Sequence, residues 1–240
     1  PAPFLSICTD DCIKKGKDYN AGGARYNTSY IQGVGIGTIS DALSSIKFNV
    51  FDNQKFTMKE LIDAMNDDFK GHEDILNLVK NKTPKYGNDD DYADDIMVSV
   101  FNEYKDYITG RPTTRGGVYH VDMLPTTCHV YFGEVMIASP NGRLAHIPLS
   151  DQKFTPAAIA GEKGIDNLAA LIRSYFAMNG HHMQFNVIDR QTLIEAQKNP
   201  EEYKELIVRV AGYSDYFRNL DKPLQNEIIE RTEQSFGGCG

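Results

Sequence analysis

The sequence predicts an α/β protein, because segments with a helical spacing of apolar residues alternate with short strand-like segments. Helical spacing is found at 57–70, 92–107, 161–176 and 191–198. Strand-like patterns are found at 118–123 and 183–187. Glycine-rich and polar breaks separate these segments, and 41% of the 240 residues are hydrophobic, which is enough to form a real core.

The bulk composition excludes several classes of partner. A net charge of −8 and a pI near 5.2 argue against nucleic acid and against anionic membranes, since both need a basic surface. No run approaches the ~20 apolar residues that span a bilayer. The first residues lack a charged start and a long apolar run, so we expect no secretory leader and a cytoplasmic protein. The chain begins without Met, and we expect it to be cut from something longer.

At the N-terminus we expect one helix over residues 4–19, with Cys8 and Cys12 four residues apart on one of its faces. The four cysteines show no ladder of paired spacings, which favours reduced thiols. A zinc site at Cys8 and Cys12 lacks further ligands nearby. Cys128 is expected to be a small buried residue.

Residues 20–27 break this helix and precede a glycine-rich stretch, QGVGIGT at 32–38. The stretch resembles a phosphate-binding loop, but it lacks the P-loop lysine and the glycine spacing of a dinucleotide fingerprint. We therefore interpret these glycines as sites of close backbone packing ahead of a helix at 39–48.

The helix at 57–70 begins at Thr57, with Glu60 placed to complete a capping box. A polar segment, 80–95, follows and contains four consecutive residues of calcium-binding type, NDDD at 88–91. The glycine and the distal glutamate of a calcium loop are absent from the required positions. The segment is interpreted as a solvated turn that leads into the helix at 92–107.

Further along, 111–117 is a predicted loop and 118–123 a strand. In the helix at 161–176 the apolar face is expected to consist of Ile165, Leu168, Leu171, Ile172 and Tyr175. The pair His181 and His182 suggests a metal, but neighbouring residues of a strand point to opposite faces, so a structural role is favoured.

The most informative stretch is IVRVAGYSD at 207–215, between two helical segments. Its glycine, Gly212, has no Cβ, so its backbone can flatten and other groups can approach it closely. A planar backbone carbon between an amide nitrogen and a carbonyl stabilises an unpaired electron. The alternative is an ordinary turn glycine at a helix end.

The stretch RVAGY resembles the radical-bearing loop of the glycyl radical enzymes, the pyruvate formate-lyase-like family. The resemblance extends to QNEIIERTEQ at 225–234, to QFNVI at 184–188, to AQKNPE at 196–201 and to LPTTCHVYFG at 124–133. Asp215 departs from the small residue that the shortest form of the motif has there.

The resemblance implies the C-terminal portion of a ten-stranded β/α barrel, with the glycyl radical loop and a terminal helix. Residues 1–151 would belong to the catalytic barrel and 152–240 to the glycine radical domain. The family pattern also implies a turn at 138–143 and a few dozen residues after Asp151 that this chain lacks. Residues 124–133 are expected to run along a barrel strand, where Thr126, Thr127 and His129 could line a polar substrate. For each of these three side chains the alternative is a buried group that backbone hydrogen bonds satisfy.

The implied cofactor is a glycyl radical on Gly212, installed by a radical-SAM activating enzyme, without a bound metal. In such enzymes the radical passes to a cysteine in a Gly-Cys-x-Glu stretch, and the thiyl abstracts hydrogen from the substrate carbon beside a hydroxyl. This chain has no Gly-Cys-x-Glu stretch, so it is expected to be inactive alone. The family is commonly homodimeric.

Within the family, the quoted stretches look most like the members that dehydrate trans-4-hydroxy-L-proline. The choline trimethylamine-lyases and the diol dehydratases share much of the pattern and remain alternatives. A further alternative is a non-catalytic spare part, a small glycyl radical protein that restores a damaged partner.

Overall fold

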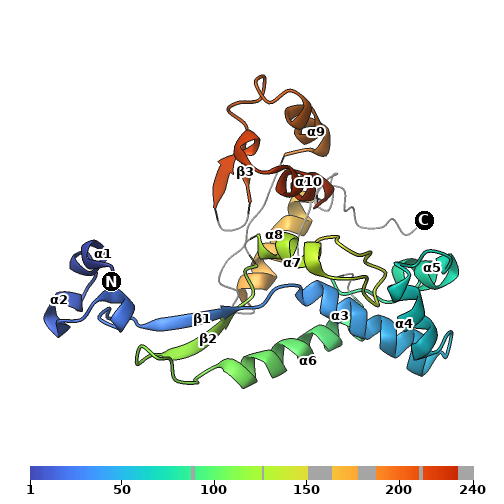
Figure 1. The fold of residues 1–240 in the computed structure, drawn as a ribbon, viewed down its shortest axis with the longest axis horizontal. Helices are drawn as coiled ribbons and strands as arrows, with labels where there is room; N and C mark the ends of the chain where they lie inside the picture. The colour runs from blue at the N-terminus through green and yellow to red at the C-terminus, as the bar shows by residue number, and fades with distance from the viewer. Residues whose placement is uncertain (88–89, 126, 151–163, 178–187, 211–212, 232–240) are drawn as a thin grey trace.

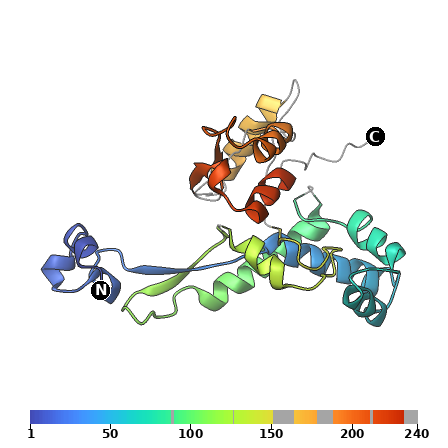
Figure 2. The ribbon, with the colours of Figure 1, turned by 45° about the horizontal axis from the view of Figure 1, so that its top comes forward.

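The computed structural model describes residues 1–87, 90–125, 127–150, 164–177, 188–210 and 213–231. Figure 1 and Figure 2 show a long layer that contains β1, β2, α3 and α6, and a C-terminal unit of β3, β4, α9 and α10 on one side of it. The helix α7 lies at the junction of the two (Figure 1).

The described residues form helices and strands with the following bounds. The long layer and its extensions contain α1 Pro3–Ile7, α2 Cys12–Lys15, η1 Tyr19–Ala21, β1 Thr28–Gln32, α3 Ile36–Ser45, the π-helix η2 Ile46–Asp52, α4 Met58–Asn66, α5 Glu73–Asn81, α6 Asp91–Ile108 and β2 Val118–Asp122. The later elements are α7 Cys128–Val135, α8 Gly164–Ala177, α9 Arg190–Lys198, β3 Ile207–Arg209, β4 Ser214–Tyr216, η4 Phe217–Asn219 and α10 Lys222–Arg231.

The strands β1 and β2 are parallel, with Thr28 opposite Val118 and Gln32 opposite Asp122. Parallel strands need a long crossover, and the segment from α3 to α6 provides it. The predicted strand at 118–123 is confirmed as β2. In the described part of the chain the strands form two two-stranded sheets, β1 with β2 and β3 with β4.

The predicted N-terminal helix over 4–19 is wrong, because the chain folds there as three short helical turns. Asp11 adopts a left-handed conformation with φ 73°, which interrupts a helix between α1 and α2. The Asp18 carboxylate accepts hydrogen bonds from Ala2 N at 2.8 Å and from Ser6 Oγ at 2.9 Å, and so folds the segment back on itself. Cys8 is consequently exposed and Cys12 buried, and they share no helix face.

The glycine-rich stretch is confirmed as a site of close packing. Gly35 is the N-cap of α3 with φ 85°, and a Cβ on Gly37 would lie 2.9 Å from Ser150 O. Beside it, Thr38 N donates to Ser150 O at 3.1 Å, and Ser150 N donates to Thr38 Oγ1 at 2.7 Å. The helix begins at Ile36 rather than at 39, and it continues as the π-helix to Asp52.

The predicted capping box at the start of α4 is present. Thr57 Oγ1 accepts from Glu60 N at 3.2 Å, and Thr57 N donates to Glu60 Oε2 at 2.7 Å. The helix ends at Asn66 instead of 70, because Asp68 and Phe69 take positive φ. Phe69 then joins Leu61 and Val79 in a core that also includes Phe56, Ala64 and Ala138.

Other expected helices are found close to their predicted bounds. The helix α6 begins after Asp90, whose side chain caps it, and α9 begins after Asp189, which accepts from Thr192 N at 2.9 Å. In α8 the expected apolar face is only partly buried, since Ile165 is 82% exposed. His181, His182, the strand at 183–187 and the segment after Ser150 lie outside the described residues.

Replacing Thr57 by Ala tests the capping box. We expect the free energy of unfolding to fall by about 1 kcal/mol, since the N3 backbone amide loses its acceptor. Lys55→Ala, an exposed change two residues earlier, is the control and should change stability by less than about 0.5 kcal/mol. Urea denaturation of the purified proteins measures both, and equal stabilities would show that the box contributes nothing.

Candidate functional site

The stretch around Gly212 forms an antiparallel hairpin, β3 with β4. Val208 pairs with Asp215 and Arg209 with Ser214, and beyond these pairs Val210 N donates to Tyr213 O at 2.9 Å. Only positions 211 and 212 are left to connect the strands, and both lie outside the described residues. Two-residue hairpin connections favour glycine, which suits the Ala211-Gly212 pair.

The inner face of the hairpin is anchored in an apolar core. Val208 and Val210 are buried there. The same core contains Val130 of α7, Leu193 and Ala196 of α9, Phe217 of η4, and Leu224, Ile228 and Ile229 of α10. The buried face of the hairpin therefore packs against residues of four helical elements.

Asp215, the departure from the shortest motif, has a structural explanation. Its Oδ1 accepts from Tyr216 N at 2.7 Å and from Asn219 Nδ2 at 3.2 Å. These bonds join β4 to the turn η4 that follows it. A small residue in place of Asp215 would leave Asn219 Nδ2 without this acceptor.

Tyr213 follows the connection directly and is 43% exposed. Partial burial raises the pKa of its phenol above the usual value, and the nearby Asp215 and Tyr131 raise it further. The phenol is therefore neutral throughout the physiological pH range.

The helix α7 corrects the expectation for residues 124–133. They were expected to follow a barrel strand, but Cys128–Val135 is helical. The run of β-branched and aromatic residues there favours a strand locally, and tertiary packing overrides that preference. Gly133 allows this packing, since a Cβ would lie 2.4 Å from Ile147 O. Cys128 is partly exposed rather than buried.

Of the two threonines predicted to line a substrate, Thr127 is described and Thr126 lies outside the described residues. Thr127 is the half-buried N-cap of α7, and its hydroxyl makes no capping hydrogen bond. Tyr131 lies four residues later, which places it on the same side of the helix.

His129 is the third candidate from the sequence, and the structure supports its interpretation as a buried, bonded imidazole. Its Nε2 lies 2.9 Å from Oε1 of Glu227 in α10, and the two side chains are only 2% and 7% exposed. Sequence reasoning did not assign Glu227 a role. Its position three residues after Leu224 and one before Ile228, on the apolar side of α10, was the available signal.

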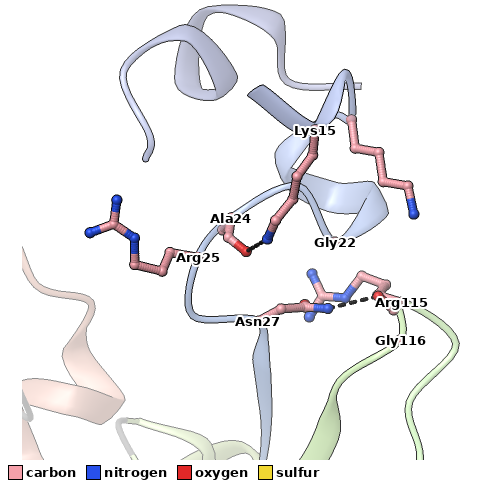
Figure 3. Close-up of a pocket in the computed structure, with 8 residues that line it drawn as sticks. Lys15, Gly22, Ala24, Arg25, Asn27, Arg115 and Gly116 are labelled. Carbon is pink, nitrogen blue, oxygen red and sulfur yellow. Dashed lines mark hydrogen bonds between the residues drawn. The ribbon is translucent and has the colours of Figure 1, made fainter. Parts of the chain in front are cut away.

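A separate cavity of about 620 Å³ lies near the N-terminus and not at the hairpin. Figure 3 shows it between residues 15–27 and the loop before β2, with Lys15, Arg25 and Arg115 around it. These cations have protein partners, since Lys15 Nζ donates to Ala24 O at 3.0 Å and Arg25 pairs with Asp10 at 3.1 Å. The residues that line the cavity do not come from the β3–β4 hairpin, so the cavity is separate from the predicted radical site.

The described residues hold neither a cluster of metal ligands nor a membrane-spanning helix. No three His, Cys, Asp or Glu side chains gather closely enough there to hold a metal ion. None of the helices in the described ranges combines the length and apolar character that crossing a membrane requires.

Comparison with known families identifies the class of protein. Residues 1–133 match the family model "pyruvate formate lyase-like", and residues 145–218 match the model "glycine radical". The first match alone covers more than half of the chain. The chain therefore belongs to the pyruvate formate lyase-like family and carries a glycine radical domain.

Individual relatives indicate which members of the family the chain resembles. The trans-4-hydroxy-L-proline dehydratase of Clostridioides difficile is 57% identical over 270 residues, which cover 98% of this chain and 34% of the relative. The (2S)-3-sulfopropanediol dehydratase of Klebsiella oxytoca is 37% identical and is covered to 33%. The chain spans about a third of the length of these relatives.

Solved structures agree in fold. The C. difficile hydroxyproline dehydratase with its substrate bound superposes with a TM-score of 0.87, over 98% of this chain and 34% of that one. The B12-independent glycerol dehydratase of Clostridium butyricum gives 0.84 at 42% identity, over 95% and 33%. These neighbours are glycyl radical enzymes, so the predicted fold class is confirmed.

The alignment length supports one further expectation. The alignment with the C. difficile enzyme runs over 270 residues, whereas this chain has 240. The alignment therefore includes at least 30 positions at which the relative has a residue and this chain has none. This agrees with the few dozen residues expected to be missing from the family pattern.

Replacing Leu193 by Ala tests how the core supports the hairpin. Leu193 is fully buried beneath Val208 and Val210, so we expect a loss of about 2–5 kcal/mol in the free energy of unfolding. Amide hydrogen exchange at Val210 should also become faster, because the strand pair loses its support. The control is Ile165→Ala at a position 82% exposed, with an expected change within about 0.5 kcal/mol. Unchanged exchange at Val210 would contradict this view of the hairpin.

Proposed function

We propose that this chain supplies the radical-bearing third of a glycyl radical dehydratase that removes water from trans-4-hydroxy-L-proline. The observation that carries the proposal is the 57% identity to the C. difficile enzyme along 98% of the chain. The match to the glycine radical model and the hairpin that encloses position 212 support it. Residues 1–151 are assigned to the catalytic barrel and 152–240 to the glycine radical domain.

In this proposal Gly212 stores the unpaired electron. A radical-SAM activating enzyme, the proposed partner, removes one hydrogen atom from its α-carbon. Glycine fits this position because a Cβ would hinder the planar backbone and obstruct close approach. A radical held at Gly212 supplies the hydrogen-atom abstraction that begins the dehydration. Val208 and Val210, shortly before Gly212 in the chain, are buried in the apolar core.

Thr127, with Thr126 beside it, is proposed to line the wall that receives the substrate hydroxyl or carboxylate. The support is its half-buried position at the start of α7, a helix whose Val130 packs in the same core as Val208 and Val210 of the hairpin. A hydroxyl there can donate or accept a hydrogen bond. The positioning of substrate near the radical is central, because reacting atoms must lie about 3–3.5 Å apart.

The cysteine and glutamate that would attack the substrate are not among these 240 residues, which hold no Gly-Cys-x-Glu stretch. The complete site is therefore proposed to form with the remainder of a longer enzyme. We place that enzyme in the cytoplasm and propose that it is a homodimer, the common state in the family. Residues 1–240 alone are expected to give no dehydration of trans-4-hydroxy-L-proline. Chromatography of the product measures the turnover. Measurable turnover by the purified chain would refute this division of roles between it and the rest of the enzyme.

Replacing Gly212 by Ala tests the radical site in the full-length protein. After anaerobic incubation with activase and S-adenosylmethionine, we expect the wild type to be cleaved at Gly212 on brief exposure to air. The variant should stay intact and lose activity by at least about 10³-fold, because its α-carbon cannot become a planar, accessible radical. Mass spectrometry of the polypeptide measures the cleavage. Cleavage of the Gly212→Ala variant at the same bond would exclude Gly212.

Replacing Thr127 by Val removes the hydroxyl and keeps the shape. We expect kcat/KM for trans-4-hydroxy-L-proline to fall by about 10-fold or more, as one lost polar contact predicts. Thr109→Val, at the exposed end of α6, is the control and should leave kcat/KM unchanged. Steady-state kinetics on equally activated samples measure both. A Thr127→Val variant with wild-type kinetics would remove Thr127 from the substrate wall.

A further inference from the structure

A buried contact between a histidine and a glutamate joins the two parts of the molecule that the proposed chemistry must bring together. His129 of α7 and Glu227 of α10 approach to 2.9 Å, with side chains 2% and 7% exposed. Burial of a carboxylate is costly unless a partner compensates it. The contact therefore holds only in one arrangement of α7 against α10. Val130, the residue after His129, packs in the apolar core. Such apolar packing is not directional and tolerates small shifts.

On one side of the pair lies the proposed substrate wall. Thr127 comes two residues before His129, at the start of the same short helix. Leu149 N donates to His129 O at 3.0 Å, which ties this turn of α7 to the segment that packs on α3. The position of His129 is therefore fixed relative to Thr127.

On the other side lies the hairpin. Gln225 Nε2, two residues before Glu227, donates to Phe217 O at 2.9 Å, and Phe217 N donates to Leu206 O at 2.8 Å. Ile228 packs in the same core as Val208 and Val210. A shift of α10 is thus transmitted to both strands that enclose position 212.

We infer that the His129–Glu227 pair is a positioning device, which sets the distance between the β3–β4 hairpin and α7, the helix that begins after Thr127. The inference rests on the proposed function and adds a role for two residues that do not contact the substrate themselves. They act by holding α10, and with it the β3–β4 hairpin, in one position against α7.

The test uses the full-length protein with Glu227→Gln, which keeps the side-chain size and removes the charge. We expect the glycyl radical signal per chain to stay within about twofold of the wild type. The value of kcat per radical should fall by about 10-fold or more, with KM changed by less than about threefold, because a displacement of about 1 Å is enough for such losses. Glu201→Gln, which removes a carboxylate that is 88% exposed in the same unit, is the matched control and should behave as wild type.

A second variant separates positioning from stability. In His129→Leu/Glu227→Met apolar side chains replace both members of the contact, and the melting temperature should equal or exceed that of the wild type. We expect its kcat per radical to remain as low as that of Glu227→Gln. Wild-type kcat per radical in this stable double variant would overturn the inference.

The same experiment distinguishes failure of the proposed function. If the wild-type protein acquires no radical while the C. difficile enzyme does so with the same activase, the proposed function is rejected together with this role. That result is visible before any variant is compared. A normal wild-type radical with unaffected variants rejects the positioning role alone.

Discussion

The contact between a buried imidazole and a buried carboxylate fixes how the C-terminal unit sits on the rest of the chain. Apolar packing brings α10, α9 and the hairpin together with Val130, but such packing is non-directional. The His129–Glu227 pair adds direction, because only one arrangement satisfies both groups. Through α10 and Phe217 that constraint extends to the strands on either side of position 212.

The rest of the chain resembles one part of a larger folded structure. Two parallel strands are not a stable sheet by themselves, and β1 and β2 expose large apolar side chains such as Tyr30, Ile31 and Val118. The N-terminal segment likewise exposes Phe4 and Ile13. These surfaces agree with a chain that spans about a third of its relatives. Function in this family therefore depends on contacts that lie partly beyond these residues.

The features predicted correctly from the sequence are those with local causes. The capping box at Thr57 and the packing glycines before α3 act within a few residues or through the absence of a Cβ. The prediction of one N-terminal helix was wrong because the Asp18 carboxylate accepts hydrogen bonds from groups 12 and 16 residues earlier in the sequence. The periodicity of apolar residues does not reveal such contacts. The hairpin strands are three residues each, too short for an alternation signal. The helical state of 128–135 and the partner of His129 depend on α10, almost a hundred residues away.

The most direct measurement of the central claim is electron paramagnetic resonance on the protein labelled with glycine deuterated at its α-carbon, after anaerobic activation. A glycyl radical keeps one α-hydrogen, and its coupling splits the signal into a doublet in unlabelled protein. The account predicts that the doublet collapses to a narrow single line in the deuterated protein. An unchanged doublet would place the unpaired electron on another residue and contradict the account. So would the absence of any signal from a folded sample, if the same activase radicalises the C. difficile relative.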